Sequence, residues 1–239
     1  MCGGIDLSET TSITSSNQGI TAAFFDVDGT LASSNLVYVY LDFCSYNLRF
    51  PRKQLWITSI LPKLIYYGCV DLCSRAYFNE IFYKNYRGVS LQEMERWARN
   101  AVERYWKPRM FPQALEKIEE HRALGHRIIL VSGGLALTLE PLARWLAVDA
   151  CAAAWAEIDK DCLTGRLPKG ALSGEAKVVA THEVAETLGL DLSISYGYAD
   201  NFADRQFLGC LGNPVAVNPD RRLKRLANQN GWPIQSWGR

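Results

Sequence analysis

The sequence has little of several features that would assign it to a special class of protein. Its 239 residues include three histidines and seven scattered cysteines, an odd number. Such cysteines predict reduced thiols in a cytoplasmic protein and exclude a disulfide framework. Cys69 and Cys73 have no second cysteine pair at zinc spacing and no nearby histidine, which disfavours a zinc site. We expect His121, His126 and His182, in or beside predicted helices, to lie at the solvated surface.

Charge and apolar runs are also limited. Lys and Arg number 26 and Asp and Glu number 25, so the basic excess of a nucleic-acid-binding protein is absent. The aromatic, apolar stretches 36–43 and 55–67 are too short and interrupted to span a bilayer. Residues 1–17 are rich in Ser and Thr, without a cationic start or an apolar stretch. They predict a disordered tail over residues 1–19 and no secretory signal.

What the chain does contain is an alternation of apolar runs and helical patterns. Short apolar runs predict buried strands at 22–25, 127–131, 150–156, 193–198 and 215–217. Strands that alternate with helices predict an α/β fold, a parallel sheet with helices on both faces. The pattern after Thr30 is aromatic and helical, so we expect a helical domain over 35–107 inserted into a core of 20–34 and 108–239.

The first of these strands ends in two carboxylates. Asp26 and Asp28 stand one residue apart and are followed by a turn at Gly29. Like charges so close repel, so a cation or a shared proton must lie between them. One carboxylate can serve as a nucleophile while its neighbour transfers protons.

Polar residues at other strand ends should join them, because parallel strands bring their carboxyl ends to one edge. Asp200 and Asp204 follow a later strand, and with Asp26 they offer the hard oxygen ligands that Mg²⁺ takes. Ser132 and the backbone N–H of Gly133 can hold phosphate oxygens at a helix start. Lys177, near the start of another helix, can stabilise charge on a transferring phosphoryl group.

These four motifs, in this order, resemble those of the haloacid dehalogenase superfamily. They are DVDGT at 26–30, VSGG at 131–134, Lys177 within GEAKV at 174–178, and the pair Asp200 and Asp204. The chain is most similar to subfamily IB, the branch that resembles phosphoserine phosphatase. The resemblance implies a Rossmann-like core with an inserted all-helical cap of type C1, and a phosphatase that uses Mg²⁺.

The resemblance also implies a mechanism. Asp26 attacks phosphorus and forms an aspartyl-phosphate, while Asp28 protonates the leaving alkoxide and then takes a proton from the hydrolytic water. Ser132, Gly133 and Lys177 bind the phosphoryl group. Mg²⁺ is implied to be held by the Asp26 carboxylate, the Asp28 backbone carbonyl and Asp200, with Asp204 supporting these metal ligands.

Each motif alone has a simpler interpretation. DVDGT could be a calcium loop, but an EF-hand loop needs glycine where Leu31 stands and a helix, not a strand, before it. Ser132 could mark an ordinary strand-to-helix turn, Lys177 a surface lysine, and Asp200 and Asp204 a helix cap. Only their joint order favours the active site.

The sequence departs from the phosphoserine phosphatase pattern at three positions. Ala199 and Ala203 replace a glycine and an asparagine beside the two aspartates of the fourth motif, and Asn201 could supply the missing polar group. Asn35 stands where those enzymes carry a glutamate for the substrate ammonium. This departure counts against phosphoserine itself.

The expected cap should choose the substrate. Its aromatic residues either receive an amphiphile, such as a lysophospholipid phosphate or phosphatidylglycerophosphate, or form the core of a small helical lid; the second interpretation is favoured. A cap that docks on a membrane face is one alternative, and a phosphoserine-type phosphatase of small metabolites is another. A phosphotransferase or mutase with the same chemistry, and a non-catalytic lipid-interaction module, remain as alternatives. The sequence does not fix the oligomeric state.

Overall fold

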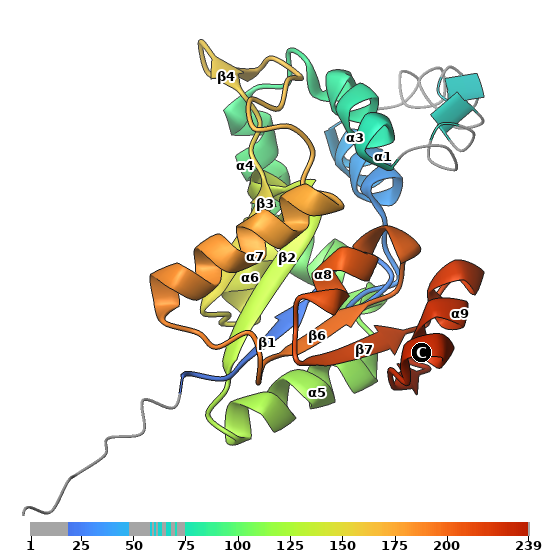
Figure 1. Ribbon diagram of the computed structural model, residues 1–239. Coiled ribbons are helices and arrows are strands. Elements are labelled where there is room, and N and C mark those ends of the chain that lie inside the picture. The colour runs from blue at the N-terminus through green and yellow to red at the C-terminus, as the bar shows by residue number, and fades with distance from the viewer. Residues whose placement is uncertain are drawn as a thin grey trace, which may run out of the picture.

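The structure is a computed structural model that describes residues 19–47 and 75–238, with single positions between 58 and 70 (Figure 1). Three parts of these predictions lie outside the described residues: residues 1–18 of the tail expected over 1–19, most of the apolar stretch 55–67, and the pair Cys69 and Cys73. Among the described residues, no helix combines the length and hydrophobicity needed to cross a membrane.

Six parallel strands form the central sheet, in the order β3-β2-β1-β6-β7-β8. They are β1 (Ala22–Phe25), β2 (Arg127–Leu135), β3 (Ala150–Ala154), β6 (Tyr196–Ala199), β7 (Asn213–Val217) and β8 (Ile234–Gln235). The predicted parallel α/β sheet is confirmed. Strand β1 lies in the middle, with Phe25 level with Leu130 on one side and Tyr198 on the other. The carboxyl end of β1 is therefore flanked by those of β2 and β6.

The bounds of several strands differ from those predicted: the strand expected at 150–156 ends at Ala154, and the strand expected at 193–198 runs over Tyr196–Ala199. Strand β2 continues to Leu135 and does not end at Val131, because its pairing with β3 resumes after a shift in register between Ser132 and Leu135. Strand β8 was not predicted, because two residues carry no readable periodicity.

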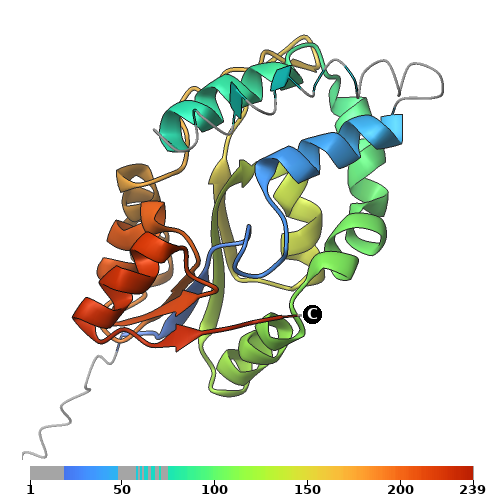
Figure 2. The same cartoon turned by 90° about the vertical axis from the view of Figure 1, so that its right-hand side faces the viewer.

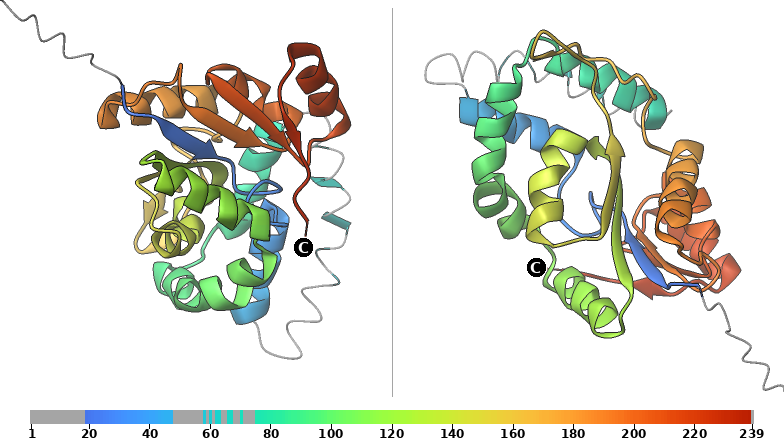
Figure 3. Two further views of the ribbon diagram at one scale, coloured as in Figure 1. Left: turned by 90° about the horizontal axis from the view of Figure 1, so that it is seen from below. Right: turned by 90° about the vertical axis from the view of Figure 1, so that its left-hand side faces the viewer.

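Helices cover both faces of the sheet, because alternate residues of each strand point to opposite sides (Figure 3). Phe25 packs in one hydrophobic cluster with α5 (Pro112–Ala123) and α6 (Ala136–Trp145). Phe24 packs in the other cluster with α7 (Glu175–Leu188), α8 (Arg205–Gly209) and α9 (Arg221–Asn230). The sheet is thus buried between two apolar layers, as its near-continuous hydrophobic strands require.

Between β1 and β2 the chain forms α1 (Leu36–Asn47), α3 (Arg75–Tyr83) and α4 (Leu91–Ala101), followed by a π-helical turn over Val102–Trp106. Figure 2 shows these helices arching over the sheet. Most of the described aromatic residues of this segment are buried in one cluster: Tyr40, Phe43, Tyr67, Phe78, Phe82, Tyr83, Tyr86, Trp97, Tyr105 and Trp106. Their abundance is therefore explained mainly by packing.

The helical segment is joined to the sheet by two adjacent stretches of chain. The backbone N–H of Ser33 donates to Arg109 O at 2.8 Å, and that of Phe111 donates to Leu31 O at 2.9 Å. A hairpin of β4 (Ile158–Asp159) and β5 (Cys162–Leu163) also reaches the segment, where Gly88 N–H donates to Leu163 O at 2.8 Å. The segment is thus held at three places by backbone hydrogen bonds.

His121 lies in the interior, so the prediction of a surface position was wrong for this residue. Its side chain is 4% exposed, with Nδ1 2.8 Å from His126 Nδ1 and Nε2 2.8 Å from the hydroxyl of Tyr198. Burial lowers the pKa of His121 to about 4, and the nearby His126 and Lys117 shift that pKa in the same direction. A local helical pattern could not reveal this contact, because Tyr198 comes from a strand distant in sequence.

This buried histidine predicts a loss of stability in mild acid. The unfolded chain binds a proton at His121 near pH 6.5, whereas the folded chain does so only near pH 4. The contribution of neutral His121 to the free energy of unfolding is complete above about pH 6.5. It falls as the pH drops and is lost below about pH 4, a change of roughly 3 kcal/mol. We expect His121→Phe to show a smaller drop in Tm between pH 7 and pH 4.5 than the wild type. The matched control is His182→Phe at an exposed position of α7, which should keep the wild-type pH dependence. Equal slopes for both variants would contradict this assignment.

Candidate active site

All seven site residues predicted from the sequence line one cavity of about 40 Å³ at the carboxyl edge of the sheet. They are Asp26, Asp28, Ser132, Gly133, Lys177, Asp200 and Asp204. They reach it from the ends of β1, β2 and β6, from the turn after β6 and from the first turn of α7. The expected convergence at a single edge is therefore present.

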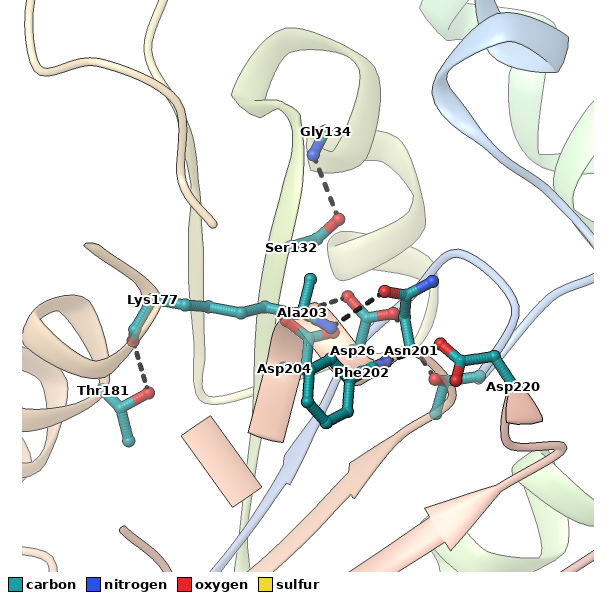
Figure 4. Close-up of polar contacts among 11 residues, drawn as sticks. Asp26, Ser132, Gly134, Lys177, Thr181, Asn201, Phe202, Ala203, Asp204 and Asp220 are labelled. Carbon is teal, nitrogen blue, oxygen red and sulfur yellow. Dashed lines mark hydrogen bonds and ion pairs between the residues drawn. The ribbon is translucent and has the colours of Figure 1, made fainter. Parts of the chain in front are cut away.

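The centre of this cavity is an ion-pair cluster around Lys177 (Figure 4). Lys177 Nζ lies 2.7 Å from Asp26 Oδ1 and 3.0 Å from Asp204 Oδ2, and the lysine is 2% exposed. Burial alone lowers the pKa of Lys177, but the charges of Asp204 and Asp26 outweigh it and raise that pKa above its ordinary value. The lysine is therefore a fixed cation, held beside the Asp26 carboxylate.

Asp200 lies against the turn that follows β1. Gly29 has φ +83°, and a Cβ on this glycine would fall 2.1 Å from Asp200 Oδ2. Only glycine combines this backbone conformation with so close an approach. The glycine of the first motif thus makes room for the carboxylate of the fourth.

The three carboxylates Asp26, Asp200 and Asp204 fit a divalent cation. One oxygen from each lies within 4.8 Å of the others, two of the residues are buried, and all are hard oxygen ligands. The single ammonium of Lys177 does not balance their charge. A bound Mg²⁺ would balance the charge of the three carboxylates. Because Gly29 has no side chain, the Asp200 carboxylate can lie beside this turn and remain within the cluster.

The contact between Gly29 and Asp200 leads to a prediction for Gly29→Ala. The new methyl group must displace the Asp200 carboxylate, so we expect kcat/KM for a phosphomonoester to fall by about 10²-fold and the Mg²⁺ concentration for half-maximal activity to rise. Gly125→Ala is the matched control, because Gly125 has φ +76° with nothing within 4 Å of its added Cβ. Both variants should lose similar stability from backbone strain, as measured by Tm. Equal activities in the two variants would contradict the role given to this contact.

Ser132 lies at the end of the regular pairing of β2 and is 1% exposed. Its Oγ accepts a hydrogen bond from Gly134 N–H at 3.1 Å. Helix α6 begins only at Ala136, so residues 132–134 belong to the irregular end of β2 and do not form the helix start that the sequence predicted. Ser132 and Gly133 still line the cavity.

The turn that carries Asp200 is fixed by a residue that sequence reasoning did not assign to the site. Asp220 Oδ2 accepts from Phe202 N–H at 2.7 Å, and Asp220 N–H donates to Asp200 O at 2.9 Å. Asn201 Oδ1 accepts from Ala203 N–H at 2.9 Å, so this asparagine caps the turn. The only signal for Asp220 in the sequence was its place before the last helix, where it is also the N-cap.

Helix α3 contributes two further residues that the sequence did not indicate. The hydroxyl of Tyr83 donates to Gly133 O at 2.6 Å, and Asn79, 2% exposed, lines the cavity. Asn35 Oδ1 accepts from Tyr38 N–H at 2.9 Å and so caps α1. How α3 lies over the sheet is a tertiary feature, which explains why no local pattern identified Tyr83 and Asn79.

Comparison with known proteins agrees with this geometry. The family of haloacid dehalogenase-like hydrolases matches residues 23–209, and the chain therefore belongs to that family. It is 30% identical over 224 residues to an inhibition of morphological differentiation protein of Streptomyces azureus, covering 92% of this chain and 79% of that protein. It is 26% identical to a phosphoserine phosphatase of Mycobacterium tuberculosis, covering 90% of this chain and 70% of that protein. A crystal structure of a protein of unknown function from Bordetella pertussis shares the fold, with a TM-score of 0.79, 24% identity and coverage of 91% of this chain and 98% of that one.

Proposed function

We propose that this protein is a Mg²⁺-dependent phosphomonoester hydrolase that works through an aspartyl-phosphate on Asp26. The observation that carries the proposal is the Asp26 carboxylate held 2.7 Å from Lys177, in the same cavity as Ser132, Asp200 and Asp204. Membership of a hydrolase family and a relative named phosphoserine phosphatase support it.

In the first step a carboxylate oxygen of Asp26 attacks phosphorus and the bond from phosphorus to the ester oxygen breaks. Asp28, two residues further along, donates a proton to that oxygen, which leaves as an alcohol. Lys177 and the hydroxyl and backbone N–H groups of residues 132–133 hold the phosphoryl oxygens as negative charge spreads over them.

In the second step water attacks the phosphorus of the aspartyl-phosphate. Asp28, now a carboxylate, takes a proton from this water, and cleavage of the acyl-phosphate bond returns Asp26 to its starting form with release of phosphate. Mg²⁺ would be held by Asp26, the backbone carbonyl of Asp28 and Asp200, supported by Asp204. When bound, it supplies charge neutralisation at the phosphoryl group.

A small substrate is proposed in preference to an amphiphile. The cavity of about 40 Å³ has room for only a few water molecules, and the described aromatic residues over it are mostly committed to packing. We propose that residues 35–107 act as a cap over a core of residues 20–34 and 108–239. A lysophospholipid phosphate would require this cap to open far more widely than a small phosphomonoester.

Asp26→Asn is the first test of the mechanism. The amide keeps the shape of the side chain but is a poor nucleophile, so release of phosphate from p-nitrophenyl phosphate with Mg²⁺ should fall by about 10³-fold or more. Asp159→Asn makes the same change at an exposed position on the β4–β5 hairpin and should retain wild-type activity. Wild-type turnover by Asp26→Asn would refute the proposal.

The same assay separates the rival functions. Phosphate release without an added acceptor favours a hydrolase over a phosphotransferase or mutase, and removal of Mg²⁺ by a chelator should abolish it. Long-chain lipid phosphates should be hydrolysed more slowly than small phosphomonoesters. Faster hydrolysis of the lipid, together with binding to liposomes, would instead support the amphiphile.

A further inference from the structure

Asn79 lines the cavity from α3, a helix that carries none of the proposed catalytic or metal-binding residues. It lies in the middle of α3, whose last residue, Tyr83, donates its hydroxyl hydrogen to Gly133 O at 2.6 Å. The Asn79 side chain is close enough to the phosphate-binding loop that a Cβ on Gly133 would lie 3.2 Å from Asn79 Nδ2. Helix α3, which Tyr83 links to Gly133, therefore holds the Asn79 amide beside the position proposed for the phosphoryl group.

The side-chain carbonyl oxygen of Asn79 is buried and accepts no hydrogen bond from the described residues. The residue is 2% exposed, and its Oδ1 has no hydrogen-bond partner among the residues that the structure describes. Buried polar atoms are almost always paired, and an exception that lines a cavity calls for a donor from a ligand. A hydroxyl or amino group on the substrate would supply that donor.

The charges around the cavity limit what else the substrate can carry. Among the described residues that line it, Lys177 is the one cation, and it already contacts Asp26 and Asp204. A carboxylate on the leaving group would face the acidic side chains of the cavity, and the described lining residues offer no further cation to pair with it. The lining of the cavity also includes Leu36 and Leu172, which suit the carbon atoms of a small alcohol.

From these contacts, and resting on the proposed phosphatase function, we infer that Asn79 selects the leaving alcohol. The substrate is the phosphomonoester of a small alcohol that bears a hydroxyl or amino donor and no carboxylate, and Asn79 Oδ1 accepts that donor's hydrogen bond. The identity of the side chain matters: an arginine or lysine here would favour a carboxylate, whereas the acceptor oxygen of an amide favours a hydroxyl or ammonium donor.

The test compares four substrates of similar size: glycerol 1-phosphate, phosphoethanolamine, O-phosphoserine and propyl phosphate. We expect kcat/KM for the first two to exceed that for propyl phosphate, which has no donor, by about tenfold or more. O-Phosphoserine, which differs from phosphoethanolamine by its carboxylate, should be poorer than phosphoethanolamine. If O-phosphoserine is the best of the four, the inference is wrong.

Two variants test the residue itself. Asn79→Leu keeps the size of the side chain but removes the acceptor, so the kcat/KM ratio of glycerol 1-phosphate to propyl phosphate should fall about tenfold. Asn79→Asp keeps the acceptor and adds negative charge, so the ratio of phosphoethanolamine to glycerol 1-phosphate should rise. Asn100→Leu, in α4 with its Nδ2 bonded to Tyr46, is the control and should change neither ratio.

These outcomes distinguish failure of the inference from failure of the proposed function. If the wild type does not hydrolyse p-nitrophenyl phosphate with Mg²⁺, the phosphatase proposal fails and this inference with it. If it does so but the ratios are unchanged in both Asn79 variants, the inference alone is overturned. Should Asn79→Leu fail to fold, as judged by circular dichroism, the isosteric Asn79→Asp still decides the question.

Discussion

The buried ion pair between Lys177 and Asp26 is the interaction on which the rest of the site depends. The two residues are 151 positions apart, so their contact fixes the start of α7 against the end of β1. A buried lysine is tolerable only with negative partners, and the cluster of carboxylates is tolerable only with a cation. Each side of this contact therefore stabilises the charge of the other. Such mutual compensation holds reactive groups in place and does little for overall stability.

Backbone contacts complete the frame around this pair. The close approach of Gly29 to Asp200 joins the turn after β1 to the turn after β6, and Asp220 holds the second turn from the start of α9. These contacts involve glycine or main-chain atoms, so they position the carboxylates without relying on flexible side chains. Ala199 and Ala203, where phosphoserine phosphatases carry glycine and asparagine, leave these contacts intact. The side chains of Asn201 and Asp220 accept the backbone N–H hydrogen bonds of the turn.

The helical segment supplies a different kind of constraint. Its aromatic core makes it a packed body, and the hydroxyl of Tyr83 joins it to Gly133 near the end of β2 by a hydrogen bond. The cavity beneath is small, and its lining combines four aspartates and Lys177 with the amide of Asn79 and apolar residues such as Leu36. Under the proposed function, the sheet core carries the reacting groups, and Asn79 on α3 is the residue proposed to select the alcohol.

The sequence alone determined the parallel sheet and the identity of the residues at the strand ends, because apolar periodicity and short motifs are local properties. It also predicted that those residues meet, since parallel strands share one carboxyl edge. It did not predict strand β8, the burial of His121, or the parts played by Asp220 and Asn79. Each of these depends on contacts between elements far apart in sequence, and only the packing of helices and strands in three dimensions decides which of them touch.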